Sequence, residues 1–227
     1  RVARITYISA EIAKKIGCDP NLAKSAASIS KSDLSSEMVY EFPELQGVIG
    51  TYYAVEAGFE KNIADVCKEH YAPLGPSDEV PSSPISIVVA LADKIDTLTC
   101  FWSINEKPTG SKDPFALRRS ALGLIRIIIE NDIRISLSDI LALGNDGADI
   151  KDLKYFIHQR MKVFLRDQSL RHDLIDACLS FDEGDDLALL VKKSIALMEF
   201  IKTSDGSNLI QGFKRANNIL LQAEQSD

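Results

Sequence analysis

The first sixteen residues, RVARITYISAEIAKKI (residues 1–16), carry the pattern that decides the fold. Their apolar side chains recur every three or four positions, which is the spacing of one face of an amphipathic α-helix. These side chains belong to Val2, Ile5, Ile8, Ile12 and Ile16. Gly17 then suits a helix end, because glycine adopts a left-handed backbone conformation at little cost. No capping residue precedes Arg1, so we expect an internal piece of a longer protein.

The same periodicity predicts helices along the rest of the chain. Asp19 followed by Pro20 is a helix-start signal, and residues 44–58 are apolar enough to suggest burial on several sides. A loop rich in Pro, Ser and Gly at residues 73–84 is the clearest break. The further expected helices span residues 19–31, 33–42, 44–58, 60–71, 85–104, 113–131, 136–143, 149–165, 169–180, 185–201 and 208–220.

No run of residues alternates apolar and polar side chains as a half-buried β-strand does. The sequence therefore predicts an all-α fold, an irregular multi-helix bundle. We expect a first domain at residues 1–135 and a second, smaller helical segment at residues 136–227.

Composition and charge restrict the kinds of partner. The net charge of −7 excludes a protein-wide basic field for nucleic acid, so any RNA contact needs a local patch. Four cysteines lie far apart at positions 18, 67, 100 and 178, which suggests neither a zinc site nor a disulfide framework. We expect reduced thiols, a cytoplasmic protein and no membrane partner, because no apolar run approaches the roughly 20 residues of a bilayer span.

Positive charge is concentrated at residues 107–119, KPTGSKDPFALRR, which hold four basic residues and one acid. Asp113 followed by Pro114 predicts a helix start there, and Arg126 and Glu130 in that helix are spaced to form an ion pair. The basic side chains can meet RNA phosphates through their charge. The alternative is a well-capped helix whose arginines tie neighbouring helices together.

Four segments in this order resemble characteristic blocks of the β subunit of bacterial glycyl-tRNA synthetase. They are KSDL (residues 31–34), MVYEFPELQG (38–47), ALADKIDTL (90–98) and PTGSKDPFALRR (108–119). The close resemblance covers about residues 1–130, and KRANNIL at residues 214–220 resembles a further block of the same subunit.

The resemblance implies an α2β2 heterotetramer in which the α subunit carries the active site. That subunit activates glycine with ATP and magnesium, while the β subunit contributes contacts to tRNA(Gly). This chain would then bind no cofactor and hold no catalytic residue. The candidate tRNA-binding residues are Lys31, Lys107, Lys112, Arg118 and Arg119.

Residues 1–130 also resemble the helical HD superfamily, whose phosphohydrolases hold metal with a His, an adjacent His-Asp pair and a later Asp. Asp93 matches the last of these and His70 remains, but Lys31 stands within the expected pair. A protonated lysine cannot ligate metal, so we expect a degenerate HD-like domain without a metal site, in which Asp93 caps a helix or pairs with a group such as Lys31. The His-Asp dipeptide at residues 172–173 is expected on a solvated helix face.

Three functions remain open at this point. The first is the tRNA-binding helical part of the synthetase β subunit. The second is a metal-dependent HD-type phosphohydrolase, and the third is a purely structural module that docks the α subunit.

Overall fold

The structure, a computed structural model, describes residues 1–144, 147–182 and 184–224. Within these ranges it contains helices and one isolated β-bridge but no strand, so the predicted all-α class is confirmed. The first half holds α1 (Val2–Ile16), α2 (Pro20–Ile29), η1 (Ser32–Ser35), α3 (Glu37–Glu41), η2 (Pro43–Leu45), α4 (Val48–Glu56), α5 (Lys61–Ala64), α6 (Val66–Glu69) and α7 (Pro84–Ser103). The second half holds α8 (Leu117–Glu130), α9 (Leu137–Ala142), α10 (Ile150–Asp167), α11 (His172–Asp182), α12 (Leu187–Ile201) and α13 (Ser204–Glu224).

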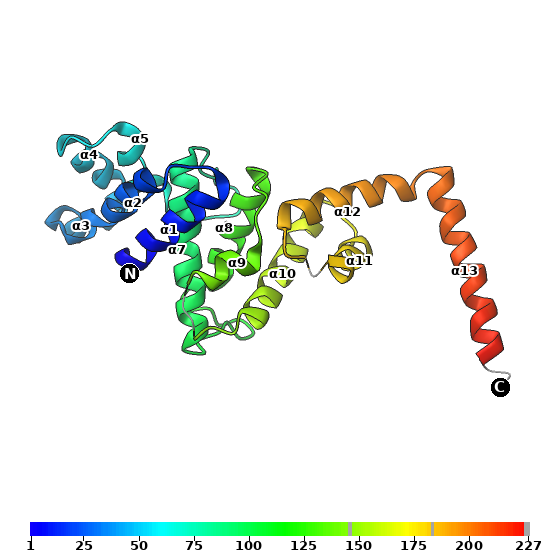
Figure 1. Cartoon of the computed structure of the whole chain (residues 1–227). Helices are drawn as coiled ribbons and strands as arrows, with labels where there is room; N and C mark the ends of the chain where they lie inside the picture. The colour runs from blue at the N-terminus through cyan, green and yellow to red at the C-terminus, as the bar shows by residue number, and fades with distance from the viewer. Residues whose placement is uncertain (145–146, 183, 225–227) are drawn as a thin grey trace.

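Helix α7 lies at the centre of the fold (Figure 1) and packs against α1, α2, α8 and α10. Every residue from position 85 to position 96 is buried. A helix that is apolar on most of its sides requires neighbours around its whole circumference. Helix α7 therefore forms the axis on which the other helices are arranged.

One hydrophobic cluster runs from Ile5 in α1 to Val191 in α12. It includes buried side chains on both sides of residue 135, such as Ile128 and Leu137. The two segments expected from the sequence therefore share a core, and the boundary near residue 135 stays a prediction. Positions 145–146, 183 and 225–227 of the second segment lie outside the described residues.

Several predicted helix ends are confirmed. Gly17 ends α1 with φ of 76°, in the left-handed conformation expected of a C-terminal glycine. The Asp19 carboxylate accepts hydrogen bonds from the first backbone amides of α2, and Ser136 and Asp149 cap α9 and α10 in the same way. These caps satisfy amides that have no partner inside the helix.

The helix predicted at residues 33–42 is wrong as a single element. The 3-10 helix η1 ends at Ser35, and Ser36 has an extended backbone before α3 begins. The Ser36 hydroxyl accepts a hydrogen bond from the Val39 amide, so the serine caps a new helix. Likewise, the helix predicted at residues 60–71 is divided into α5 and α6 at Asp65.

The helix predicted at residues 44–58 is shorter, because Gly47 with φ of 80° interrupts it and α4 begins at Val48. The burial expected for this segment on several sides is also wrong. Tyr52 is 66% exposed and Val55 is 47% exposed, and only Gly50 and Ala54 of α4 are buried. An apolar helix thus lies largely open to solvent.

The C-terminal helices α12 and α13 lead away from the body of the molecule (Figure 1). Helix α13 begins at Ser204, earlier than the expected position 208. In the part of the chain that the structure describes, no helix combines the length and the hydrophobicity that crossing a membrane requires.

Candidate nucleic-acid interface

The basic stretch at residues 107–119 connects α7 to α8. The helix start predicted at Asp113 and Pro114 is displaced, because α8 begins only at Leu117 after Ala116 adopts φ of 53°. Asp113 still caps the helix, since its carboxylate accepts hydrogen bonds from the amides of Leu117 at 2.8 Å and Arg118 at 2.9 Å. The carboxylate therefore fixes the loop against the first turn of α8.

Lys107 and Lys112 lie at the start of this loop and differ in their surroundings. The Lys107 ammonium forms an ion pair with Asp152 at 2.8 Å and lies over the ring of Trp102. The hydrogen bond from Lys107, and then the one from Trp102, hold the pKa of the Asp152 carboxyl below its usual value. Lys112 is exposed and makes no ion pair within the described residues, so its charge is available to a partner.

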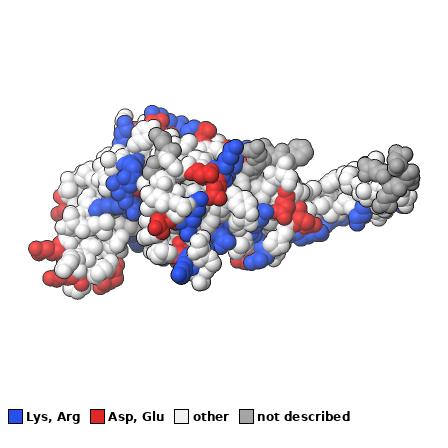
Figure 2. Space-filling view, turned by 90° about the horizontal axis from the view of Figure 1, so that it is seen from below, with Lys and Arg blue, Asp and Glu red and all other residues white. Residues whose placement is uncertain are grey.

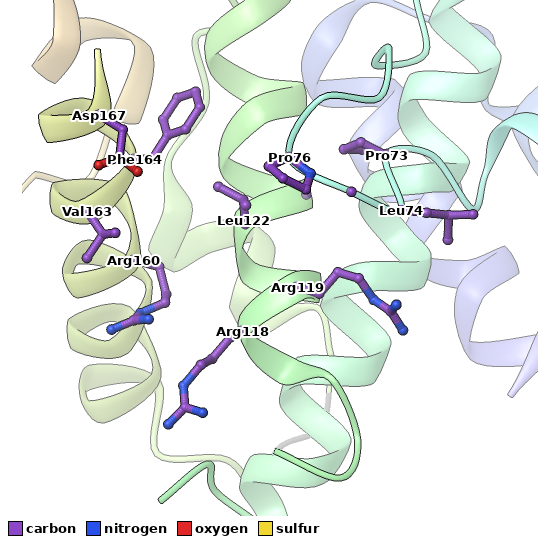
Figure 3. Close-up of a pocket in the computed structure, with 12 residues that line it drawn as sticks. Pro73, Leu74, Pro76, Arg118, Arg119, Leu122, Arg160, Val163, Phe164 and Asp167 are labelled. Atoms are coloured by element: carbon purple, nitrogen blue, oxygen red, sulfur yellow. The ribbon is translucent and has the colours of Figure 1, made fainter. Parts of the chain in front are cut away.

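Arg118 and Arg119 border a cavity of about 320 Å³ between α8 and α10. Figure 3 shows Arg118 and Arg160 extending toward the same side, Arg118 from α8 and Arg160 from α10, whereas Arg119 extends to the other side of α8. The walls are mainly apolar, and a single carboxylate, that of Asp167, lies among the lining groups. The lining also includes Pro73, Leu74, Pro76, Leu122, Val163 and Phe164.

The loop before α7 forms one wall of the pocket, and Arg126 holds this loop in position. Its guanidinium donates hydrogen bonds to the carbonyl oxygens of Gly75 at 3.0 Å and Asp78 at 2.7 Å. It also pairs with Glu130 at 2.6 Å, which confirms the predicted i,i+4 ion pair. Arg126 is therefore structural, as the alternative interpretation of the arginines in this helix expects, and it ties the loop to α8.

Arg160 was not among the sequence candidates. Its Nε atom is inaccessible to solvent and has no hydrogen-bond partner within the described residues. Buried donors are normally satisfied, so this atom is an exception. Because solvent does not reach Nε, a ligand would meet the outer nitrogens of the guanidinium instead. The sequence does hold a signal, because Arg160, Val163, Phe164 and Asp167 follow helical spacing and share one face. It cannot show that this face meets α8.

The pocket combines two properties that nucleotides require. Planar guanidinium groups donate pairs of hydrogen bonds to phosphate oxygens. The apolar walls formed by Leu122 and Phe164 offer contact surface to a ribose or an unstacked base. Arg118 already donates one hydrogen bond to the Gly110 carbonyl at 2.7 Å, which orients its side chain and leaves its other donors for a ligand.

Lys31, the remaining sequence candidate, lies in the interior. Its side chain is 8% exposed and its ammonium pairs with Asp93 at 3.0 Å, as expected from the sequence. The same nitrogen lies 2.8 Å from Nε2 of His70 and over the ring of Tyr71. These internal partners offset the Lys31 charge, although the residue lines a second cavity, of about 410 Å³, together with Arg1 and Arg119.

The charges around Lys31 perturb one another. Burial, followed by the neighbouring Lys31 ammonium, lowers the pKa of His70 to about 3. Burial also lowers the pKa of Lys31, against the attraction of Asp93. Burial works against ionisation of Asp93, but Lys31 and Arg1 hold the pKa of this carboxyl below its usual value. The cluster is therefore arranged as neutral imidazole, ammonium and carboxylate.

This arrangement bears on the HD-like resemblance. The Lys31 nitrogen lies where the His70 and Asp93 side chains converge, and its positive charge opposes a metal cation there. Among the described residues there is no group of three His, Cys, Asp or Glu side chains with the geometry of a metal site. His172 and Asp173 are exposed, as expected for a solvated helix face. The HD-like character itself stays a prediction.

The fold and the pocket define an all-α protein with a surface pocket rich in arginine. Comparison with known proteins identifies the family within this class. The sequence model of a family described as "Glycyl-tRNA synthetase beta subunit" matches residues 1–180. The chain belongs to this family.

Similar proteins bear matching names. The chain is 60% identical to the "Glycine--tRNA ligase beta subunit" of Ruegeria sp. (strain TM1040) over 227 residues, covering 100% of the chain and 33% of that protein. It is 58% identical to the protein of the same name from Paracoccus denitrificans (strain Pd 1222), again over 100% of the chain and 33% of the relative. The chain thus spans about a third of the length of these curated relatives.

Proposed function

We propose that this chain is part of the β subunit of a glycine-tRNA ligase and that the pocket between α8 and α10 binds the phosphate backbone of tRNA(Gly). The observation that carries the proposal is that Arg118, Arg119 and Arg160 all line one cavity, with Arg118 and Arg160 extending toward the same side of it (Figure 3). In a chain of net charge −7, such a local excess of cations favours a polyanion as ligand.

In this proposal the chain contributes binding and architecture, whereas the chemistry occurs on the α subunit. There ATP and magnesium activate glycine, and the α and β subunits form a cytoplasmic α2β2 assembly. The arginines contact phosphates and so position the tRNA without reading its sequence. The exposed Lys112 extends the positive surface along the loop before α8.

The proposal is tested by reversing the three charges in the complete β subunit, as R118E, R119E and R160E together. We expect the affinity for tRNA(Gly) to fall at least about tenfold at low salt, because several phosphates are no longer neutralised. The slope of affinity against salt concentration also becomes shallower, by about one for each phosphate that loses its arginine. Filter binding over a series of salt concentrations measures both quantities.

A matched control reverses three exposed charges elsewhere, at Lys14, Lys24 and Lys202. We expect this variant to bind tRNA much as the unaltered protein does. Equally weakened binding by both variants would assign the effect to total charge, and unchanged affinity in the arginine variant would show that the pocket does not bind tRNA.

A further inference from the structure

Residues 32–60 form the most one-sided stretch of charge in the chain. They hold six acidic residues and no lysine or arginine. Those acids are Asp33, Glu37, Glu41, Glu44, Glu56 and Glu60, and all except Asp33 are exposed. Figure 2 shows acidic side chains gathered at the left end of the molecule, the end that α3, α4 and α5 occupy in Figure 1. We call residues 32–60 the acidic lobe.

The acidic lobe also exposes large apolar side chains. Tyr40 is 89% exposed and Tyr52 is 66% exposed. Six more large apolar residues of the lobe are exposed: Leu34, Met38, Phe42, Val48, Tyr53 and Val55. Isolated apolar residues are ordinary on a protein surface, but a contiguous group marks an interaction site. Val48, Tyr52, Tyr53 and Val55 form such a group because they lie on one short helix, α4.

The apolar side chains of helix α4 require a packing partner that the described part of this chain does not supply. It contains no basic residue and one acid, Glu56, and its other side chains are apolar or small. A helix that is apolar on all sides is normally buried, yet most of α4 faces solvent. A groove of about 620 Å³ lies along it. Its lining combines the apolar side chains of Val48, Tyr52, Val55 and Phe59 with Thr51 and the charged residues Glu56, Lys61, Asp65, Lys68 and Glu69. Val48, Tyr52 and Val55 follow the helical spacing of a face that receives another helix, and Phe59 adds to the apolar lining after α4 has ended at Glu56.

The charge of the lobe decides which class of partner fits. Five exposed carboxylates repel a phosphate backbone, so RNA is disfavoured here. The complementary surface is a protein with apolar side chains at its centre and lysine or arginine around them. Because the relatives are named β subunits, a second kind of subunit is the partner that the assembly itself supplies.

We propose that the acidic lobe docks the α subunit of the ligase, with an amphipathic helix of that subunit in the groove beside α4. The proposal rests on the proposed function, because it takes this chain as part of a heteromeric glycine-tRNA ligase. It adds a surface: Tyr40, Tyr52 and Val55 make the apolar contact, and the glutamates around them pair with basic residues of the partner.

Hydroxyl-radical footprinting of the complete β subunit, alone and assembled with the α subunit, tests the location. We expect Tyr40, Tyr52 and Tyr53 to be oxidised readily in the β subunit alone and at least fivefold more slowly in the assembly. Protection already present in the β subunit alone would mean that another part of the same chain covers the lobe. Reactive tyrosines in the assembly would mean that nothing docks there. Either result overturns the proposal.

A charge variant separates this proposal from the tRNA pocket. We expect Y40E combined with Y52E to weaken binding of the α subunit at least tenfold in analytical ultracentrifugation, while the β subunit keeps its affinity for tRNA. Tyr155, which is 63% exposed on α10, provides the matched control Y155E, and we expect that variant to assemble normally. Normal assembly of the Y40E and Y52E double variant contradicts docking at the lobe. If the R118E, R119E and R160E protein loses affinity for tRNA and the double variant does not, the result supports the tRNA pocket independently.

Discussion

His70 is buried and has a hydrogen-bond partner at each ring nitrogen. Nδ1 lies 2.7 Å from the Val66 carbonyl oxygen, which only accepts, so this nitrogen carries the proton. Nε2 then accepts from the Lys31 ammonium at 2.8 Å. A second proton on the ring would face that ammonium in a buried site, which is the physical reason for the low pKa.

The low pKa of His70 predicts a pH dependence of stability. The folded imidazole has a pKa of about 3, whereas the unfolded one titrates near its ordinary value of about 6.5. Between these values the unfolded chain binds the proton and the folded chain does not. The contribution of His70 to the free energy of unfolding is therefore complete above pH 6.5 and decreases as the pH falls toward 3. From pH 6.5 to pH 5 we expect this group to cost about 2 kcal/mol in the free energy of unfolding.

The H70Q variant isolates this contribution, because glutamine keeps hydrogen-bonding groups but does not titrate. Urea unfolding of both proteins at pH 7 and pH 5 gives the comparison, since the titrating groups outside this cluster contribute equally to both. We expect the loss of stability on acidification to be smaller in H70Q. Equal losses in the two proteins would show that His70 already carries a second proton when folded.

The contacts of single residues could be predicted where the sequence pattern pointed to both partners. Asp93 was expected to cap a helix or to pair with a group such as Lys31, and the ion pair with Lys31 is present. The interior location of Lys31 was not predicted, because charge alone does not reveal burial. Arg160 was missed because its role depends on which face of α10 meets α8, and that is a tertiary contact.

At the scale of elements, the start of α8 connects helix capping with the position of the arginines. Ala116 adopts φ of 53° and Asp113 reaches across it to the first amides of the helix. A non-glycine residue in this conformation costs about 1 kcal/mol. The carboxylate offsets that cost by satisfying two amides, and so it holds Arg118 beside the cavity.

Replacing this carboxylate should loosen the start of α8. We expect D113A to lower the free energy of unfolding by about 1 kcal/mol, the usual effect of losing a helix cap. D113N retains an oxygen acceptor and should lose less. Thermal unfolding followed by circular dichroism measures the difference, and identical transitions for D113A and the unaltered protein would mean that the cap contributes nothing.

Helices with clear caps were predicted closely, as at α9 and α10, because the signals are local. The stretch from residue 33 to residue 58 was predicted less well. Short segments there turn at Ser36, Gly47 and the loop between them, and Gly47 lies directly against the backbone of α6. The exposure of α4 was opposite to the prediction, since apolar periodicity indicates a need for cover and does not say which chain supplies it.

At the scale of the whole molecule, the core built on α7 separates two surfaces of opposite character. The arginine pocket lies between α8 and α10, and the acidic lobe lies at the end formed by α3, α4 and α5 (Figure 1). Distant sites with no shared residues contribute independently. One surface therefore suits a polyanion while the other suits a protein with a basic rim.

The central claim, that the pocket between α8 and α10 contacts tRNA, is tested most directly by crosslinking. A photoreactive phenylalanine analogue in place of Val163, which lines the cavity, is introduced into the complete β subunit and assembled with the α subunit and tRNA(Gly). We predict a covalent adduct to the tRNA that decreases when R118E, R119E and R160E are added. Crosslinks to protein alone, from an enzyme that charges tRNA normally, would contradict the claim.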